Sequence, residues 1–295
     1  MGDQHKGWRN NYRASMPASE RMLKDLRSFT KDVGMSIRHG GKLRTIVTYP
    51  DYPSKRTTIQ KIARKMGWRL TNKPLKSADI ILFFEDTTHK DTSTDDFLTT
   101  AEPVLNLACT DISKERVEEV HQSVFGYGTF IDPLTFEGTA VEKSDENAKH
   151  DGHYIQCPIA QVTEGCIYQR VLSNRNEEGL AVDHRVPVMG SEIPLTYLKK
   201  KEWEVRFSNE VTTSSLHTPE SLFNSEELRL ITEFTAAIHA EFCELDIIRD
   251  NNDGRIYIID VNTTPYGPPA GLDTQDRLEA ISLLSSAFQK AFLSA

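Results

Sequence analysis

The stretch 244-ELDIIRDNNDGRIYIIDVNTTP-265 decides how the rest of the chain is interpreted. Two apolar, β-branched runs flank a polar Asn/Asp/Gly cluster, which predicts a β-hairpin. If residues 252–254 form a three-residue loop with Gly254 in the left-handed conformation, Asp246 lies opposite Asp260. Side chains alternate along a strand, so Asp260 and Asn262 share a face. The stretch therefore predicts three side-chain oxygen donors on one side of a two-stranded ribbon.

Such a donor set permits two interpretations. Hard cations such as Mg²⁺ prefer oxygen ligands, usually one or two carboxylates completed by nucleotide phosphates. The alternative is an ordinary hairpin whose acidic residues face water. The hairpin alone leaves both open.

The whole chain has the character of a globular protein with room for two or three subdomains. It has 295 residues, 38% of them hydrophobic and 26% charged. No apolar run approaches the roughly 20 residues that cross a bilayer, and no signal-peptide core is found. The four cysteines lack C-x-x-C or zinc-like spacing, so we expect reduced thiols, a cytoplasmic location and no membrane association. The net charge of −8 argues against nucleic-acid binding but leaves room for a local basic pocket.

The N-terminal part differs in charge from the rest. Residues 1–44 contain ten Lys and Arg against four Asp and Glu. Apolar residues recur there at helical spacing, at Met22, Leu23, Leu26 and Phe29. We expect residues 1–40 to form a basic helical extension.

The next part alternates strand-like and helix-like segments. Strands are expected at residues 43–49, 68–71, 78–84 and 103–107, and a helix at residues 57–66. This order predicts a small Rossmann-like α/β layer over residues 41–108. The segment lacks G-x-G-x-x-G and G-x-x-x-x-G-K-[ST], so the dinucleotide and P-loop interpretations are unsupported.

Two lysines stand out after this layer. Asp111 or Ser113 can cap a helix that ends at Gly126, and Lys114 falls in its first turn. A cation is not favoured at that end of a helix, so Lys114 is expected to face an anion. Lys143 lies in an expected strand over residues 138–143, which a polar loop over 144–153 follows. The alternative is two solvated lysines.

The remaining segments supply further polar pairs. An expected strand over 181–190 carries Asp183 and Arg185 on one face. The run Lys199-Lys200-Lys201 is expected to be solvated, as charge runs usually are. Helices are expected over 225–242 and at the C-terminus, whose apolar stripe is Leu278, Ile281, Leu284, Phe288 and Phe292.

Taken together, these motifs resemble the ATP-grasp superfamily over residues 41–272. The two lysines resemble the pair that grips nucleotide phosphates, and the loop over 144–153 resembles the one that closes over them. Gln169-Arg170 stands where the family usually has Gln-Glu beside adenine. The resemblance implies nucleotide contacts from Lys114, Lys143, Gln169, Asp183 and Arg185.

The resemblance extends to the metal and acceptor motifs. Asp183-His184-Arg185-Val186 is similar to an Asp-x-Arg-Val strand whose arginine reaches a phosphate. Arg206-Phe207-Ser208-Asn209 resembles the Arg-x-Asn element of the glutamate-ligase branch, with one residue inserted. Asp246, Asp260 and Asn262 match the metal ligands, and Thr263-Thr264-Pro265 is similar to the ending of that motif in D-alanine ligases.

The implied fold is α/β (α+β), an ATP-grasp fold with a Rossmann-like N-terminal layer. Residues 109–172 would form the central lid subdomain, and residues 173–295 the C-terminal subdomain with the metal site.

The implied function is an ATP- and Mg²⁺- (or Mn²⁺-) dependent ligase. It would activate a substrate carboxylate as an acyl phosphate for attack by an amine. Arg185 and Arg206 would be catalytic, with Arg206 and Asn209 at the substrate. The acceptor would be a small molecule or a peptide, and a homodimer is expected by analogy.

Two other functions stay open. The hairpin is also similar to that of inositol-phosphate kinases of the same fold. A kinase would place Lys149, His150 and His153 at a phosphorylated substrate, and Lys199–Lys201 would add positive charge there. The second alternative is a non-catalytic nucleotide-binding module, which the metal motif and both lysines disfavour.

Overall fold

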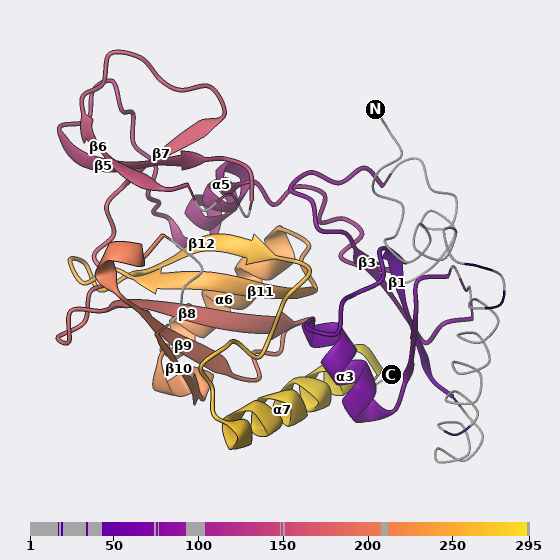
Figure 1. Ribbon diagram of the computed structural model, residues 1–295. Helices are drawn as coiled ribbons and strands as arrows, with labels where there is room; N and C mark the ends of the chain where they lie inside the picture. Colours follow the sequence, from indigo (N-terminus) through magenta and orange to yellow (C-terminus); the bar gives the residue numbers. More distant parts are fainter. Residues whose placement is uncertain are drawn as a thin grey trace.

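The computed structural model describes residues 17, 19, 34, 43–73, 75, 77–92, 104–147, 149, 151–207 and 212–293. The expected helix around residues 22–29, together with His150 and Asn209, lies outside them. The described residues form three sheets with helices packed against them (Figure 1). None of the described helices is long and apolar enough to cross a bilayer.

The N-terminal sheet is parallel, with strand order β2-β1-β3-β4. Its strands are β1 (Thr45–Pro50), β2 (Arg69–Thr71), β3 (Ile80–Phe84) and β4 (Val104–Leu105). All five residues of β3 are buried, as a continuous apolar run predicts for a central parallel strand. Helix α3 (Thr58–Met66) ends at Gly67, whose φ of 68° suits glycine. The expected Rossmann-like alternation is therefore present, although β4 has only two residues.

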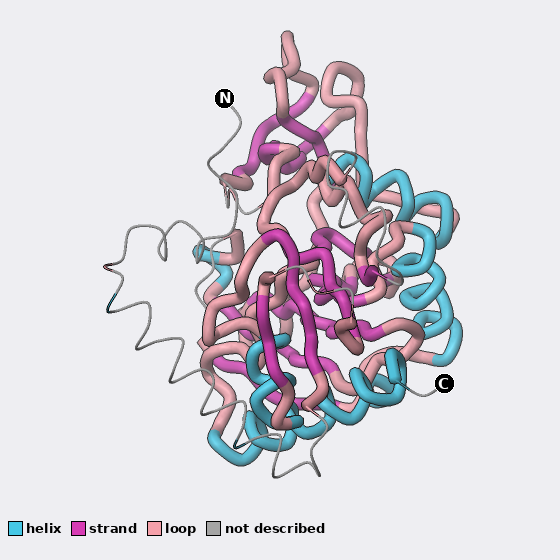
Figure 2. The backbone as a smooth tube through the Cα atoms, turned by 90° about the vertical axis from the view of Figure 1, so that its right-hand side faces the viewer, coloured by secondary structure: helices cyan, strands magenta, loops and turns pink. Residues whose placement is uncertain are grey.

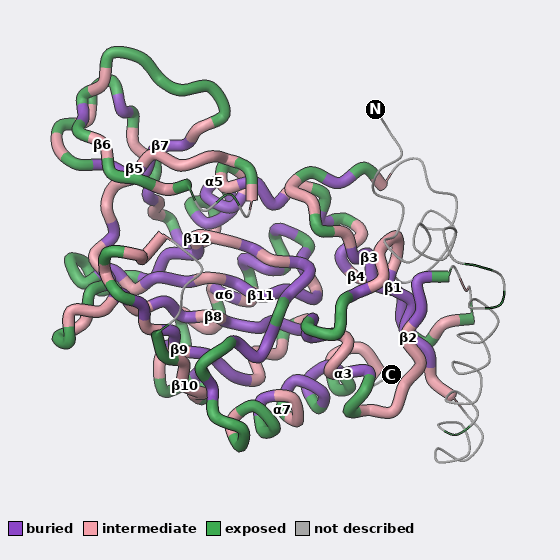
Figure 3. Tube along the Cα trace, in the orientation of Figure 1, coloured by how far each residue is buried: buried purple, intermediate pink, exposed green. Residues whose placement is uncertain are grey.

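The segment predicted as the lid contains a three-stranded antiparallel sheet of order β6-β5-β7, which we call the lid, and helix α5 (Lys114–Phe125) precedes it. Its strands are β5 (Gly138–Ser144), β6 (His153–Cys157) and β7 (Cys166–Arg170). Strand β6 was not expected, because its mixed sequence shows little apolar alternation. The lid stands apart from the other sheets, and its loop over residues 158–165 is largely exposed (Figures 2 and 3).

The largest sheet has the order β10-β9-β8-β11-β12 and is antiparallel throughout. Its strands are β8 (Ala181–Met189), β9 (Thr196–Lys201), β10 (Thr213–His217), β11 (Phe242–Arg249) and β12 (Ile256–Asn262). Two short 3₁₀ helices, η1 (Trp203–Val205) and η2 (Pro219–Ser221), flank β10.

One face of this sheet is apolar. Leu245, Ile247 and Val186 on that face pack against helices α5 and α6 (Ser225–Ala237) in one core cluster. The polar residues Asp246, Asp260 and Arg185 alternate with them and line a pocket. A second core joins α3 and α7 (Thr274–Leu293) to the N-terminal sheet.

The hairpin of β11 and β12 brings Asp246 opposite Asp260, as predicted. The loop, however, is longer than expected, because β11 ends at Arg249 and β12 begins at Ile256. A bulge next to this pair compensates: Ile247 lies opposite Ile258, which leaves Ile259 without a cross-strand partner. Gly254 has the expected left-handed φ, 72°.

Arg170 ties the end of the lid sheet to this hairpin. Its guanidinium forms ion pairs with Asp250 at 2.6 Å and Asp253 at 3.0 Å, and it donates to the hydroxyl of Tyr257. The Asp250 side chain is fully buried and also accepts from the backbone N–H of Ser173. This anchor fixes the hairpin loop to the segment that leaves the lid.

We predict that Arg170→Ala lowers the free energy of unfolding by about 2–3 kcal/mol, because it leaves the buried carboxylate of Asp250 without its cation. Urea denaturation measures the change. Arg229→Ala is the control: its pairs with Glu226 and Glu233 on α6 are exposed, so a much smaller loss is expected. Equal losses in the two variants would show that the anchor is not a stabilising contact.

Candidate functional site

A pocket of about 580 Å³ lies between the lid and the polar face of the large sheet. Most of the residues that the sequence singled out line it: Lys114, Lys143, Lys149, Gln169, Asp183, Arg185, Arg206, Asp246, Asp260 and Asn262. His153 does not, because it is exposed on β6 and lies 3.7 Å from Glu142. The fold thus gathers residues from one helix, several strands and the loops between them around one cavity.

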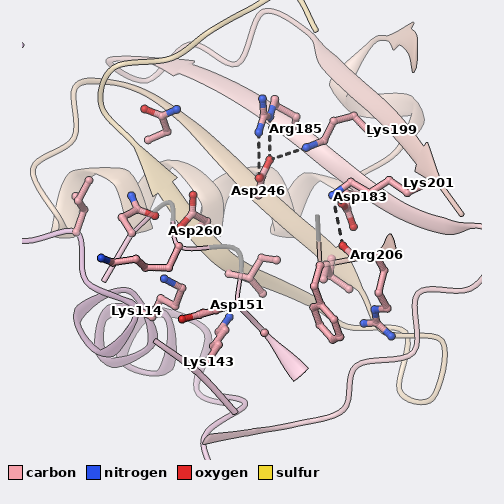
Figure 4. Close-up of a pocket in the computed structure, with 18 of the residues that line it drawn as sticks. Lys114, Lys143, Asp151, Asp183, Arg185, Lys199, Lys201, Arg206, Asp246 and Asp260 are labelled. Carbon is pink, nitrogen blue, oxygen red and sulfur yellow. Dashed lines mark hydrogen bonds and ion pairs between the residues drawn. The ribbon is translucent and has the colours of Figure 1, made fainter. Parts of the chain in front are cut away.

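A cluster of opposite charges surrounds Asp246 (Figure 4). Its carboxylate accepts from Arg185 Nε at 2.9 Å and Nη2 at 3.2 Å, and from Lys199 Nζ at 3.3 Å. Burial alone would raise the pKa of Asp246, but the two cations hold it far below its usual value. Burial alone would lower the pKa of Arg185, yet the charges of Asp246 and Glu244 raise it. Arg185 is therefore always charged and is held beside Asp246.

Glu244 is a member of this cluster that the sequence argument passed over. It lies opposite Asn262 in the ladder, is only 2% exposed, and its Oε1 is 3.3 Å from Arg185 Nε. Burial is the main cause of a raised pKa for its carboxyl group. The period-two pattern could have found it, because Glu244 precedes Asp246 by two residues and shares its face.

A second cluster, at the other side of the pocket, joins the two predicted lysines to Asp260 (Figure 4). Burial and the charge of Lys114 lower the pKa of Lys143 to about 8. Burial also lowers the pKa of Lys114, against the charges of Asp260 and Asp145. Two lysines this close to each other favour an anion between them.

Within the described residues, Asp260 lacks the direct cation contacts that Asp246 has. Burial, and then the charge of Asp246, raise its pKa to about 6. No described residue donates a hydrogen bond to it, whereas Asn262 Oδ1 accepts from the Thr264 backbone N–H at 2.8 Å and its hydroxyl at 3.2 Å. A buried carboxylate whose pKa is raised by a facing carboxylate, and to which no described residue donates a hydrogen bond, fits a hard cation.

Protein carboxylates alone would not complete such a site. Within the described ranges, three or more His, Cys, Asp or Glu side chains do not gather at any point where they could hold a metal ion. A cation at Asp246 and Asp260 would need the amide oxygen of Asn262 and oxygens from a ligand, which is the usual arrangement for Mg²⁺ with a nucleotide.

The expectation that Lys199–Lys201 is solvated was wrong for two of the three lysines. They lie in β9, so Lys199 and Lys201 point to the pocket face and are 3% and 8% exposed. Lys201 forms an ion pair with Asp183 at 2.9 Å, whereas Lys200 points outward to Glu178. The run was interpreted by its charge, and its strand alternation was overlooked.

Arg206 lies away from both carboxylates of the hairpin. It donates to the Tyr154 hydroxyl at 2.9 Å and to the backbone oxygen of Leu172 at 3.0 Å. Its guanidinium also stacks over the ring of Trp203, with 4.3 Å to the centroid. In Figure 4 it lies on the opposite side of the pocket from Lys114, Lys143 and Asp260. In this conformation it connects the lid to the large sheet.

An apolar wall completes the pocket. Ile112, Val141, Leu172, Ile248 and Ile259 line it together with the side chain of Gln169. Val141 and Gln169 are directly opposite each other in the β5–β7 ladder, and Lys143 follows on the same face. An apolar wall next to a cationic end suits a ligand with a flat ring and an anionic tail.

No protein-family model matches the sequence, and no curated protein matches it. Solved structures do match. The VanG D-Ala:D-Ser ligase from Enterococcus faecalis has a TM-score of 0.55 at 9% identity, over 85% of this chain and 100% of that one. The ATP-grasp ligase PsnB, in complex with a phosphomimetic variant of its minimal precursor, Mg and ADP, has a TM-score of 0.54 at 10% identity, over 85% and 99%.

A further PsnB structure, with minimal precursor, Mg and ADP, has a TM-score of 0.52 at 12% identity and covers 83% of this chain and 98% of that one. At such identities the likeness concerns the fold alone. It confirms the fold predicted from the hairpin, the two lysines and their order: the chain has the ATP-grasp fold.

Proposed function

We propose that the protein is an ATP- and Mg²⁺-dependent ligase that activates a carboxylate as an acyl phosphate for attack by an amine. The observation that carries the proposal is the convergence of Lys114, Lys143 and Asp260 in one pocket with the Asp246–Arg185 pair. The similar structures are named as ligases, which supports this chemistry over others of the same fold.

The charge of each pocket residue indicates which part of Mg²⁺-ATP it would contact. Lys114 and Lys143 would neutralise the phosphates of ATP, and the apolar wall around Val141 would take the base. Asp246, Asp260 and Asn262 would hold Mg²⁺, which would offset charge on the β- and γ-phosphates. Arg185 and Lys199, fixed beside Asp246, would stabilise the phosphoryl group during transfer. The lid above would exclude water and strengthen each of these interactions.

The reaction has two steps. A carboxylate oxygen of the substrate bonds to the γ-phosphorus while the bond to the bridging β–γ oxygen breaks, and ADP leaves. An amine then attacks the acyl carbon, loses a proton, and expels inorganic phosphate. The acceptor would be a small molecule or a peptide.

A kinase that phosphorylates a hydroxyl is the second candidate. Lys149 supports it, since this residue lines the pocket, although it forms an ion pair with Glu146 at 2.7 Å. His153, which the kinase hypothesis also placed at the substrate, is exposed and outside the pocket. The ligase therefore remains the first choice.

Trapping with hydroxylamine separates the two candidates. The protein is incubated with ATP, Mg²⁺, pools of carboxylic acids and peptides, and hydroxylamine. A hydroxamate supports an acyl phosphate, whereas a stable phosphomonoester without hydroxamate contradicts the ligase. Tight ATP binding without turnover in any pool would favour a non-catalytic module.

We predict that Asp260→Asn lowers kcat at least about a hundredfold, because an amide cannot supply the charge that holds the metal. Turnover is measured as ADP release in the pool that gives hydroxamate. The fold should survive, since the described structure shows no hydrogen bond to Asp260. Asp276→Asn, on α7 and outside the pocket, should retain activity. Unfolding of the Asp260 variant in thermal denaturation would instead make Asp260 a structural residue.

We also predict that the affinity for Mg²⁺-ATP falls as the pH rises through about 8. Lys143, whose pKa is about 8, is charged below this value and neutral above it, so the phosphates lose one cation. Titration calorimetry from pH 6.5 to 9.5 measures the affinity. Lys143→Arg should shift the fall beyond this range, because arginine stays protonated. An unchanged midpoint in that variant would show that another group is responsible.

A further inference from the structure

A buried chain of hydrogen bonds connects helix α5 to the pocket. Glu118, 5% exposed, receives at Oε2 a hydrogen bond from the Thr129 hydroxyl at 2.8 Å. Its Oε1 receives the backbone N–H of Phe130 at 2.9 Å and that of Thr129. A Cβ at Gly128 would collide with Oε1, so glycine there gives the carboxylate its space. Glu118 is thus an acceptor for three donors.

This arrangement dictates how the amide of Gln169 points. The Thr129 hydroxyl has one proton, which it donates to Glu118, so towards Gln169 its oxygen can only accept. The 2.7 Å contact between Thr129 Oγ1 and Gln169 therefore requires the amide NH₂ on that side. The carbonyl oxygen of Gln169 points the other way. Within the described residues this oxygen accepts no hydrogen bond, and it is not fully buried. The side chain that carries it lines the pocket.

The surroundings of this oxygen identify the group that it would meet. Val141 lies opposite Gln169, and Leu172 adds to the same apolar wall. A lone acceptor at an apolar wall favours a ligand with a hydrogen-bond donor there and disfavours one that presents an oxygen. A purine with a 6-amino group supplies this donor. A 6-oxo purine would instead place its carbonyl oxygen next to the carbonyl oxygen of Gln169.

We infer that Glu118 and Thr129 are positioning residues that orient Gln169 as an acceptor and so make the pocket select a 6-amino purine over a 6-oxo purine. The inference rests on the proposed binding of a purine nucleotide at this site. It assigns nucleotide selectivity to Glu118, which does not itself line the pocket.

The experiment compares the dissociation constants of ATP and of inosine triphosphate, which differ in the group at position 6 and in the proton that inosine carries on the adjacent N1. The wild type should bind ATP about tenfold more tightly, the value of one well-placed hydrogen bond. In Glu118→Gln the oxygen of the new amide still accepts from the backbone N–H groups of Thr129 and Phe130. The NH₂ of this amide then faces the Thr129 hydroxyl and donates to it. The Thr129 hydroxyl then donates to Gln169, whose amide turns its NH₂ to the pocket. The preference should fall to unity or invert.

Thr129→Ser retains the hydroxyl and is the matched control, which should keep the wild-type preference. Thr129→Val, which lacks the hydroxyl, should lose it and provides a second test if Glu118→Gln fails to fold. ATP binding with the wild-type preference unchanged in Glu118→Gln or Thr129→Val would overturn the positioning role of Glu118 and Thr129, and the proposed function would stand. Failure of the wild type to bind either nucleotide would overturn the proposed function and the inference with it.

Discussion

The repulsion between Asp246 and Asp260, which face each other across a two-stranded ribbon, shapes the whole site. Arg185 and Lys199 contact Asp246 directly, so it stays ionised despite burial. Within the described residues Asp260 has no such contact, and its pKa rises to about 6. The structure thus stabilises one carboxylate with two cations and gives the other no direct cation contact from the described side chains, which is why we propose that Asp260 helps to hold a metal ion. The charges of Lys114 on α5 and Lys143 on β5 act on Asp260 from one side of the pocket.

Much of this could be predicted from the sequence, because the signals are local. Strand alternation and a left-handed glycine were enough to pair Asp246 with Asp260, even though the loop and the bulge at Ile259 differ from the expected geometry. A cation in the first turn of a helix was enough to single out Lys114. The order of these motifs predicted the fold, which the structural comparisons confirm.

The missed features depend on which strand a residue belongs to or on contacts between distant segments. Lys199 and Lys201 were hidden in a charge run, since only the β9 ladder shows that they alternate into the pocket. The anchor from Arg170 to Asp250 joins residues 80 positions apart, and no local pattern signals it. Arg206, which the motif assigns to the acceptor, lines the pocket and also contacts Tyr154 and Leu172, contacts that no local pattern signals; its role at the acceptor stays a prediction.

We propose that this pocket holds a nucleotide through a metal ion. Calorimetric titration of the unmodified protein with a non-hydrolysable ATP analogue, in Mg²⁺ and then in EDTA, measures this binding. We expect one nucleotide bound per chain in Mg²⁺, with affinity at least about tenfold weaker in EDTA, because Asp246 and Asp260 would then repel the phosphates. Equal affinity in the two conditions, or no binding in Mg²⁺, would contradict it.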